Sequence, residues 1–309
     1  MSHNSSSSPV ITRNQSNSIP VGEGPRGMAI SNDGSRVFVC NYMSDNVSVI
    51  DTRNKKVIHT IAVERYPRNI ALGHEGKRAY VTNYGSSSVS VIDTETYAVG
   101  NITVGRHPNG VVVSRDGKHV YVTVRQNKEW LAIIDTRLYA VSRVQGLPSP
   151  SISVDISPDD SRLYISSTNA PAGPYEDALT VISSKTFKVI NIIKTEKYPS
   201  AVTVSPDGRE VYIVGLDTRK LTVLDTRSLT TRHFDFVACE GKIVFGEKNA
   251  YAVDQTEKEV VEVNTHTHEI VRRVPIPGAF EPYDMVLDQH NRAYISDYQS
   301  DEVHIIDLI

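Results

Sequence analysis

The sequence predicts an all-β protein, a seven-bladed β-propeller of four-stranded antiparallel blades. Three observations predict it: a unit of about 42 residues recurs seven times, each unit contains four short β-rich runs, and turn-forming residues separate those runs. Each unit is marked by a hydrophobic segment that ends at Asp51, Asp93, Asp135, Ser183, Asp225, Asn264 or Asp307. These positions are 42, 42, 48, 42, 39 and 43 residues apart, a period that fits one four-stranded blade.

The second unit illustrates the expected strands in order. β-rich runs cover Asn69–Leu72, Ala79–Asn83, Val89–Asp93 and Val99–Val104. The turn segments GHEG, YGSSS and TETY separate them, and Asp-Gly turns recur at the first position in other units. Val and Ile stand at successive positions instead of alternating strictly. This pattern predicts strands buried on both faces, as in sheets packed radially between two neighbours.

The two ends of the chain are predicted to close the ring. The last unit ends after its third expected strand, EVHIIDLI, whereas NSIPVG at 17–22 matches fourth strands such as HTIAVE and NITVG. An N-terminal strand at 17–22 should therefore complete blade 7 and remove the open sheet edges. We expect one propeller domain over 16–309, preceded by a disordered Ser/Asn-rich tail over 1–15.

The composition is that of an ordinary soluble globular protein, with 39% hydrophobic residues and a formal charge of −3. Basic residues are neither in excess nor clustered, so no nucleic-acid partner is expected. No stretch approaches the roughly 18 apolar residues of a membrane helix, and no secretory signal is visible. We therefore expect no membrane partner and a cytoplasmic location. Cys40 and Cys239 lie several repeats apart and are expected to be free thiols.

Strand order predicts where a site would lie. The connections from fourth to first strands and the loops from second to third strands share one face, here called the top face, where propellers usually bind ligands around the central channel. The residues that begin the innermost strands are Arg26, Arg68, Asn109, Ile152, Ser200, Glu240 and Tyr283. Those that end the second strands are Tyr42, Tyr84, Arg125, Thr168, Leu216, Gln255 and Tyr298.

Charged and aromatic members of these two rings gather on blades 6, 7, 1, 2 and 3. Blades 4 and 5 contribute only uncharged, non-aromatic residues: Ile152, Thr168, Ser200 and Leu216. Guanidinium groups bind carboxylate or phosphate, and tyrosines offer both a ring face and a hydroxyl. This half-ring predicts a site for a small anionic or zwitterionic molecule. The expected ligand-binding residues are Arg26, Arg68, Arg125, Tyr42, Tyr84, Tyr298 and Asn109. The alternative is that these residues belong to the repeat consensus and carry solvated charges.

Any reaction at this site is expected to be acid–base chemistry without a cofactor, as in a lyase, isomerase or cyclase. Glu240 or Tyr283 would act as base or acid, with His107 as a further candidate, while Arg26 and Arg68 would hold a developing anion. No phosphate loop, dinucleotide fingerprint or nucleophile elbow is present.

Two further features bear on function, the histidines and an insertion in blade 4. The histidines are scattered, with His266 and His268 in a lower turn, so no metal site is expected. The segment STNAPAGPYEDA at 167–178 makes the top loop of blade 4 about six residues longer than its neighbours. It could fold over the channel mouth as a lid with Tyr175 and Glu176 at its tip, or it could be tolerated drift.

The segments YVTNYGSSSVSVIDT (80–94), VFVCNYMSDNVSVIDT (37–52) and VYVTVRQNKEWLAIIDT (120–136) resemble the YVTN-repeat β-propeller family over nearly the whole chain. That resemblance implies the fold and little about function. A weaker resemblance is to the streptogramin B lyases, seven-bladed propellers whose last blade carries a Pro-His-Gly run with the catalytic histidine. FEPYDMVLD (280–288) is similar there, but Tyr283 stands at the histidine position, and Asp297 lies near the family's acid. The missing imidazole argues against that elimination chemistry.

Two functions of different classes follow. A small-molecule-binding propeller predicts that Arg26→Ala or Arg68→Ala abolishes ligand binding without lowering thermal stability. A protein-interaction scaffold, which presents its rim or a flat face to a protein partner, predicts that rim mutations abolish partner binding.

Overall fold

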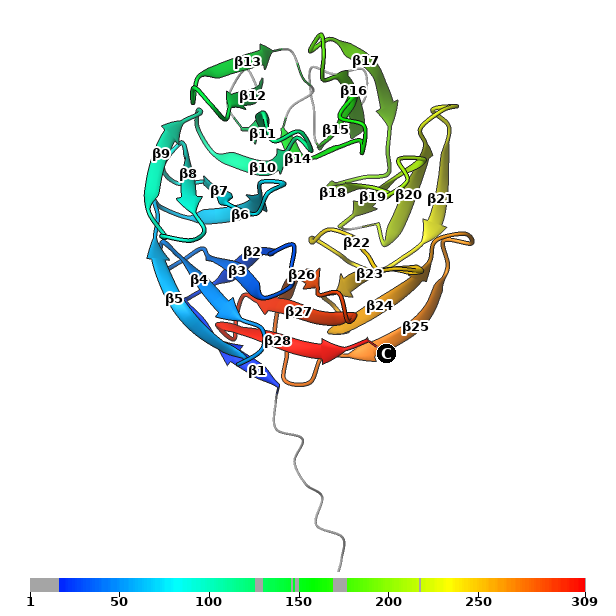
Figure 1. Cartoon of the computed structure of the whole chain (residues 1–309). Coiled ribbons are helices and arrows are strands. Elements are labelled where there is room, and N and C mark those ends of the chain that lie inside the picture. The colour runs from blue at the N-terminus through cyan, green and yellow to red at the C-terminus, as the bar shows by residue number, and fades with distance from the viewer. Residues whose placement is uncertain are drawn as a thin grey trace, which may run out of the picture.

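In the computed structural model, seven four-stranded antiparallel sheets are arranged in a ring (Figure 1), so the predicted seven-bladed propeller is confirmed. The structure describes residues 17–125, 130–145, 147, 150–168, 177–216 and 218–308. The tail expected over 1–15 lies outside these residues. Within them there is no helix long and apolar enough to cross a membrane.

The first four blades follow one another along the chain. Blade 1 comprises β2 (Pro25–Ile30), β3 (Arg36–Asn41), β4 (Asn46–Asp51) and β5 (Lys56–Ala62). Blade 2 comprises β6 (Pro67–Leu72), β7 (Arg78–Asn83), β8 (Ser88–Asp93) and β9 (Val99–Thr103). Blade 3 comprises β10 (Pro108–Val113), β11 (His119–Val124), β12 (Trp130–Asp135) and β13 (Val141–Gln145). Blade 4 comprises β14 (Ser151–Ile156), β15 (Arg162–Ser167), β16 (Ala178–Ser183) and β17 (Val189–Lys194).

The last three blades complete the ring. Blade 5 comprises β18 (Pro199–Val204), β19 (Glu210–Gly215), β20 (Lys220–Asp225) and β21 (Thr231–Asp235). Blade 6 comprises β22 (Val244–Phe245), β23 (Asn249–Asp254), β24 (Glu259–Asn264) and β25 (Ile270–Pro275). Blade 7 comprises β26 (Pro282–Leu287), β27 (Arg292–Asp297) and β28 (Glu302–Asp307), with β1 (Ser18–Pro20) as its outer strand.

The ring closes as predicted, because β1 pairs antiparallel with β28. Ile19 stands opposite Val303, and two backbone hydrogen bonds extend the ladder beyond the strand, from Val21 N to the Asp301 carbonyl at 3.0 Å and from Ile305 N to the Asn17 carbonyl at 2.7 Å. Ile19 is buried with Val303 and with residues of blade 1. The first and last strands of the chain thus join in one sheet and one apolar cluster.

The recurring Asp-Thr and Asp-Gly pairs of the sequence have a structural reason. In blades 1, 2, 3 and 5 the aspartate at the end of the third strand accepts a hydrogen bond from a backbone N–H three residues on, as in Asp93 with Thr96 at 2.8 Å. The next threonine donates to the carbonyl of the glycine in the lower hairpin of the same blade, as in Thr94 Oγ1 to Gly76 O at 2.6 Å. These glycines have positive φ, 69° at Gly76, which a side chain would strain. The repeat motif therefore ties the two lower turns of a blade together.

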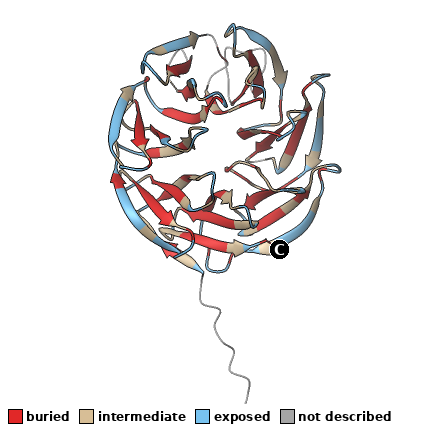
Figure 2. Ribbon diagram, in the orientation of Figure 1, coloured by how far each residue is buried: buried red, intermediate tan, exposed pale blue. Residues whose placement is uncertain are grey.

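The apolar core lies between the blades. The inner three strands of each blade are buried, whereas most of the outer strand is exposed (Figure 2). In the described residues, seven buried clusters each join neighbouring blades, for example Phe38 and Cys40 of blade 1 with Val81 and Ile92 of blade 2. Cys40 and Cys239 are buried free thiols, as predicted, and burial raises the pKa of both, to about 12 for Cys239. They are therefore core residues rather than nucleophiles.

Candidate functional site

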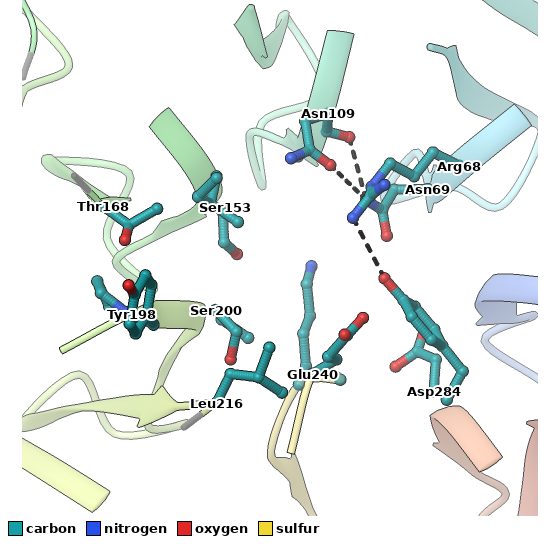
Figure 3. A pocket seen from close by; sticks show the side chains of 17 residues that line it. Arg68, Asn69, Asn109, Ser153, Thr168, Tyr198, Ser200, Leu216, Glu240 and Asp284 are labelled. Carbon is teal, nitrogen blue, oxygen red and sulfur yellow. Dashed lines mark hydrogen bonds between the residues drawn. The ribbon is translucent and has the colours of Figure 1, made fainter. Parts of the chain in front are cut away.

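A cavity of about 200 Å³ lies on the top face, where the inner strands of blades 2 to 7 converge (Figure 3). It is lined by Arg68, Asn69, Asn109, Gly110, Ile152, Ser153, Thr168, Tyr198, Pro199, Ser200, Ala201, Leu216, Glu240, Gly241, Lys242, Tyr283 and Asp284. Arg68, Asn109, Glu240 and Tyr283 were expected at a site from the sequence. The uncharged ring residues of blades 4 and 5 (Ile152, Thr168, Ser200 and Leu216) line the same cavity, so they are part of the candidate site.

Several predicted residues lie on the top face without lining this cavity. They are Arg26, Arg125, Tyr42, Tyr84, Tyr298 and His107. His107 is exposed, its ring lies 4.6 Å from that of Tyr84, and its Nδ1 is 3.1 Å from the Tyr84 carbonyl. The Tyr42 ring stacks on Tyr66 at 4.9 Å.

Sequence reasoning missed five polar or aromatic lining residues: Asn69, Ser153, Tyr198, Lys242 and Asp284. Asn69, Ser153 and Asp284 each follow a ring residue directly. In these blades, 2, 4 and 7, the pairing of the inner strand with the second strand shifts register at this point, for instance between Ser151 and Ser153. At such a β-bulge two residues oppose one on the partner strand. Two successive side chains therefore reach the cavity, whereas a regular strand would place only one there.

Arg26 is held in a tyrosine cage formed by Tyr42, Tyr283 and Tyr298. Its guanidinium carbon lies 4.7, 4.7 and 4.6 Å from the three ring centroids, and Nη1 donates to the Tyr283 hydroxyl at 3.0 Å. Burial alone would lower the pKa of Arg26, but the tyrosines and Glu240 outweigh it and raise the pKa. The guanidinium is thus occupied by the protein's own aromatic rings, which changes the expectation for its removal.

We expect Arg26→Ala to lower thermal stability as well as to disturb the site. Removing a partly desolvated guanidinium from between three rings should cost about 1–2 kcal/mol of unfolding free energy. Urea unfolding followed by tryptophan fluorescence would measure it. Arg125→Ala is the matched control, because the Arg125 guanidinium forms no hydrogen bond, ion pair or cation–π contact with another described residue. Equal midpoints for wild type and Arg26→Ala would contradict this structural role.

Tyr283 receives hydrogen bonds from two guanidinium groups. Besides Arg26, Nη2 of Arg68 donates to the same hydroxyl oxygen at 3.4 Å (Figure 3). Burial raises the pKa of this phenol, against the opposing effect of Arg68 and Arg26. Tyr283 is therefore a neutral phenol at neutral pH. Since both arginines occupy acceptor positions of its oxygen, its own O–H proton is free to be donated to a bound molecule.

The segment before β22 brings Glu240 and Lys242 to the cavity. Glu240 was expected to begin an innermost strand, but β22 covers only Val244–Phe245 and Glu240 lies in the irregular segment before it. This segment passes close to β26: a Cβ at Gly241 would lie 2.5 Å from the Tyr283 carbonyl oxygen. Only glycine permits that approach. Glu240 and Lys242, the charged residues on either side of Gly241, therefore lie beside Tyr283 and Asp284.

The side chains of Glu240 and Lys242 have no hydrogen bond or ion pair in the described part of the chain, although the charge of Glu240 acts on Tyr283 and that of Lys242 on Asp284. The backbone N–H of Lys242 does donate to the Asp284 carboxyl. Asp284 is 9% exposed and accepts a hydrogen bond from Met28 N at 3.0 Å. Burial raises the pKa of the Asp284 carboxyl, which the Met28 N–H and Lys242 oppose. Two cations and two carboxyl groups thus line one small cavity.

Metal ligation has no support from side-chain clusters. Among the residues that the structure describes, no group of three or more His, Cys, Asp or Glu side chains is placed to hold a metal ion. His268 is buried with its Nε2 2.9 Å from Glu210, while His266 is exposed. Tyr175 and Glu176, at the tip of the proposed lid, lie outside the described residues.

No protein-family model matches the chain, and no curated protein matches it. The fold does match solved structures. Hydrazine synthase of Kuenenia stuttgartiensis matches with a TM-score of 0.81 and 21% identity, covering 97% of this chain and 99% of the other. The Cps50 (Swd1) β-propeller domain of Myceliophteria thermophila matches with a TM-score of 0.79 and 11% identity, covering 96% and 100%.

A third structure bears on the lyase resemblance. The catalytically inactive His-to-Ala variant of virginiamycin B lyase from Staphylococcus aureus, with quinupristin, matches with a TM-score of 0.77 and 15% identity, covering 96% of this chain and 97% of the other. At these identities the likeness shows the propeller fold alone. The YVTN-repeat resemblance stays an expectation drawn from the motifs.

Proposed function

We propose that this propeller binds a small anionic or zwitterionic molecule in the top-face cavity. One observation carries the proposal: Arg68, Lys242 and Glu240 line a cavity of about 200 Å³, and neither Lys242 nor Glu240 is paired with another described side chain. Charged groups in a partly desolvated pocket without partners are unfavourable unless a ligand or water satisfies them. The volume is below the roughly 300–1,000 Å³ of pockets for drug-sized ligands, which suits a small metabolite.

The same groups support proton transfer. Tyr283 has a donatable proton beside two guanidinium groups that would stabilise a developing phenolate, and Glu240 is an available base. A lyase, isomerase or cyclase that works without a cofactor is the reaction class these residues suit. No elimination by an imidazole is proposed, because Tyr283 stands at the histidine position of the lyase resemblance.

A thermal-shift screen tests the binding proposal. Small carboxylates, amino acids and phosphorylated metabolites are screened against the wild type, and we expect at least one hit. A ligand at a hundredfold its Kd adds about 2.7 kcal/mol to the unfolding free energy. Hits are then incubated with the protein, and products are sought by mass spectrometry, with Tyr283→Phe as the variant that should stop turnover.

Three variants locate the binding. Arg68→Gln and Lys242→Met should lose the shift, whereas Arg125→Gln, on the same face but outside the cavity, should keep it. A shift that survives both cavity variants would place the ligand elsewhere. A screen without any hit would contradict the proposal and favour the protein-interaction scaffold, for which affinity capture on the intact protein is the next measurement.

A further inference from the structure

The cavity has a charged end and an uncharged, largely apolar end. Arg68 lies on one side, Tyr198 and Leu216 lie on the opposite side, and Glu240 and Asp284 come from neighbouring blades (Figure 3). We propose that the ligand is an α-amino acid, or a close analogue, with an apolar side chain. This inference rests on the proposed function and narrows its ligand class.

The charged end has partners for both the carboxylate and the ammonium group of an amino acid. Arg68 and the Tyr283 hydroxyl are hydrogen-bonded at 3.4 Å, and both can donate to a carboxylate. Glu240 acts on Tyr283 electrostatically, but its carboxylate accepts no hydrogen bond from a described residue, so its oxygens are available to accept from an ammonium group. A carboxylate at Arg68 and an ammonium at Glu240 would each meet a group of opposite charge.

The opposite charges of the cavity do not neutralise one another. Among the described residues, neither Arg68 nor Lys242 forms an ion pair with Glu240 or Asp284. A simple anion would satisfy the cations and leave Glu240 facing a second negative charge, which is unfavourable. A simple amine would leave Arg68 and Lys242 uncompensated. A zwitterion satisfies both sets.

The apolar end comes from the wall of blades 4 and 5. Ile152, Leu216 and Ala201 line the cavity there, and the Tyr198 ring, 39% exposed, stands at the same side. Ser153, Thr168 and Ser200 line the same wall, but the Thr168 and Ser200 hydroxyls already donate to Asp177 and to the Cys239 carbonyl. Burial of apolar ligand surface against these side chains adds affinity in proportion to the area removed from water. This wall therefore favours an aliphatic side chain over a hydrogen or a further charge.

Isothermal titration with four matched probes tests the inference on the full-length protein. L-leucine carries all three features, 4-methylpentanoate lacks the amine, 3-methylbutylamine lacks the carboxylate, and L-alanine lacks most of the side chain. We expect L-leucine to bind at least about tenfold more tightly than each of the others.

Variants assign the contacts. Glu240→Gln should weaken L-leucine at least about tenfold while leaving 4-methylpentanoate unchanged or tighter, and Leu216→Ala should remove the preference of leucine over alanine. Glu281→Gln is the matched control, because Glu281 is exposed and does not line the cavity. Thermal unfolding of each variant confirms that it is folded.

The outcomes separate this inference from the proposed function. Equal affinity for L-leucine and 4-methylpentanoate, or for L-leucine and L-alanine, would overturn the amino-acid assignment. So would a ligand from the wider screen that depends on Arg68 and Lys242 while L-leucine does not bind, and the proposed function would then stand. Absence of any cavity-dependent ligand would overturn both.

Discussion

Deleting residues 1–22 should destabilise the whole propeller, because it removes β1 from blade 7 and leaves the ring open. β1 contributes the buried side chain of Ile19 and the backbone ladder to β28. Truncating one buried isoleucine alone typically costs about 2–5 kcal/mol. The loss of a whole strand should exceed that, against a total stability of roughly 5–15 kcal/mol for a folded domain. The midpoint of urea unfolding measures the effect.

Deletion of residues 1–14 is the control, since it ends before β1 begins at Ser18. It should leave the unfolding midpoint unchanged. Ile19→Asp, which keeps the chain length but places a charge in the closing cluster, should destabilise as the longer deletion does. If deletion of 1–22 unfolds at the wild-type midpoint, ring closure by β1 does not contribute to stability.

Asp297→Ala should be the most damaging single substitution in blade 7. Asp297 is fully buried and accepts hydrogen bonds from the backbone N–H groups of Phe280 at 2.6 Å and Glu281 at 2.9 Å, and its Oδ2 lies 3.1 Å from His304 Nε2. Removing the carboxylate leaves the buried His304 and the part-buried N–H groups of Phe280 and Glu281 without their acceptor, and breaking such a buried pair typically costs about 3–5 kcal/mol. Denaturant unfolding measures the loss. Asp235→Ala, at an exposed aspartate on β21, should leave the midpoint within error.

The same carboxylate should contribute to acid sensitivity. Burial by itself would raise the pKa of Asp297, but hydrogen bonds from His304 and from the Phe280 and Glu281 N–H groups hold it well below its usual value of 3.8. A carboxylate with a depressed pKa in the folded state stabilises the protein above its unfolded-state pKa, and this contribution is lost as pH falls through the folded-state pKa. The stability gap between wild type and Asp297→Asn should therefore be widest at neutral pH and shrink below about pH 4. A gap that stays constant down to pH 3 would contradict this.

The repeat made the fold predictable in detail. The four strands expected in the second unit coincide with β6 to β9 within two residues at each end. The repeat aspartates Asp51, Asp93, Asp135 and Asp225 each accept a local hydrogen bond, and the glycines at 34, 76, 117 and 208 in the lower hairpins adopt a positive φ. These are interactions between residues near one another in the chain, so the sequence pattern records them directly. The expectation that Glu240 begins a regular innermost strand in blade 6 was wrong. This unit lacks the proline that precedes the ring residue in most other blades, and its chain is irregular up to Val244.

The site was predictable only in part. Of the site residues predicted at the start of the innermost strands, Arg68, Asn109, Glu240 and Tyr283 line the cavity. It gave Arg26 a ligand-binding role, whereas the structure encloses its guanidinium between three tyrosines. Tyr42 and Tyr298, which belong to this cage, stand on blades 1 and 7, at opposite ends of the chain. No spacing in the sequence reveals that their rings meet over one arginine.

The sequence by itself determined the number of blades, the strand order and the closure of the ring, because these follow from a period of about 42 residues and from local turn chemistry. Only the tertiary structure decided which polar groups satisfy one another and which are left to face a cavity. That partition depends on distances between blades, on β-bulges that turn a second side chain inward, and on the close approach of Gly241 to β26. The side chains of Lys242 and Glu240 face the cavity without an ion-pair partner among the residues that the structure describes.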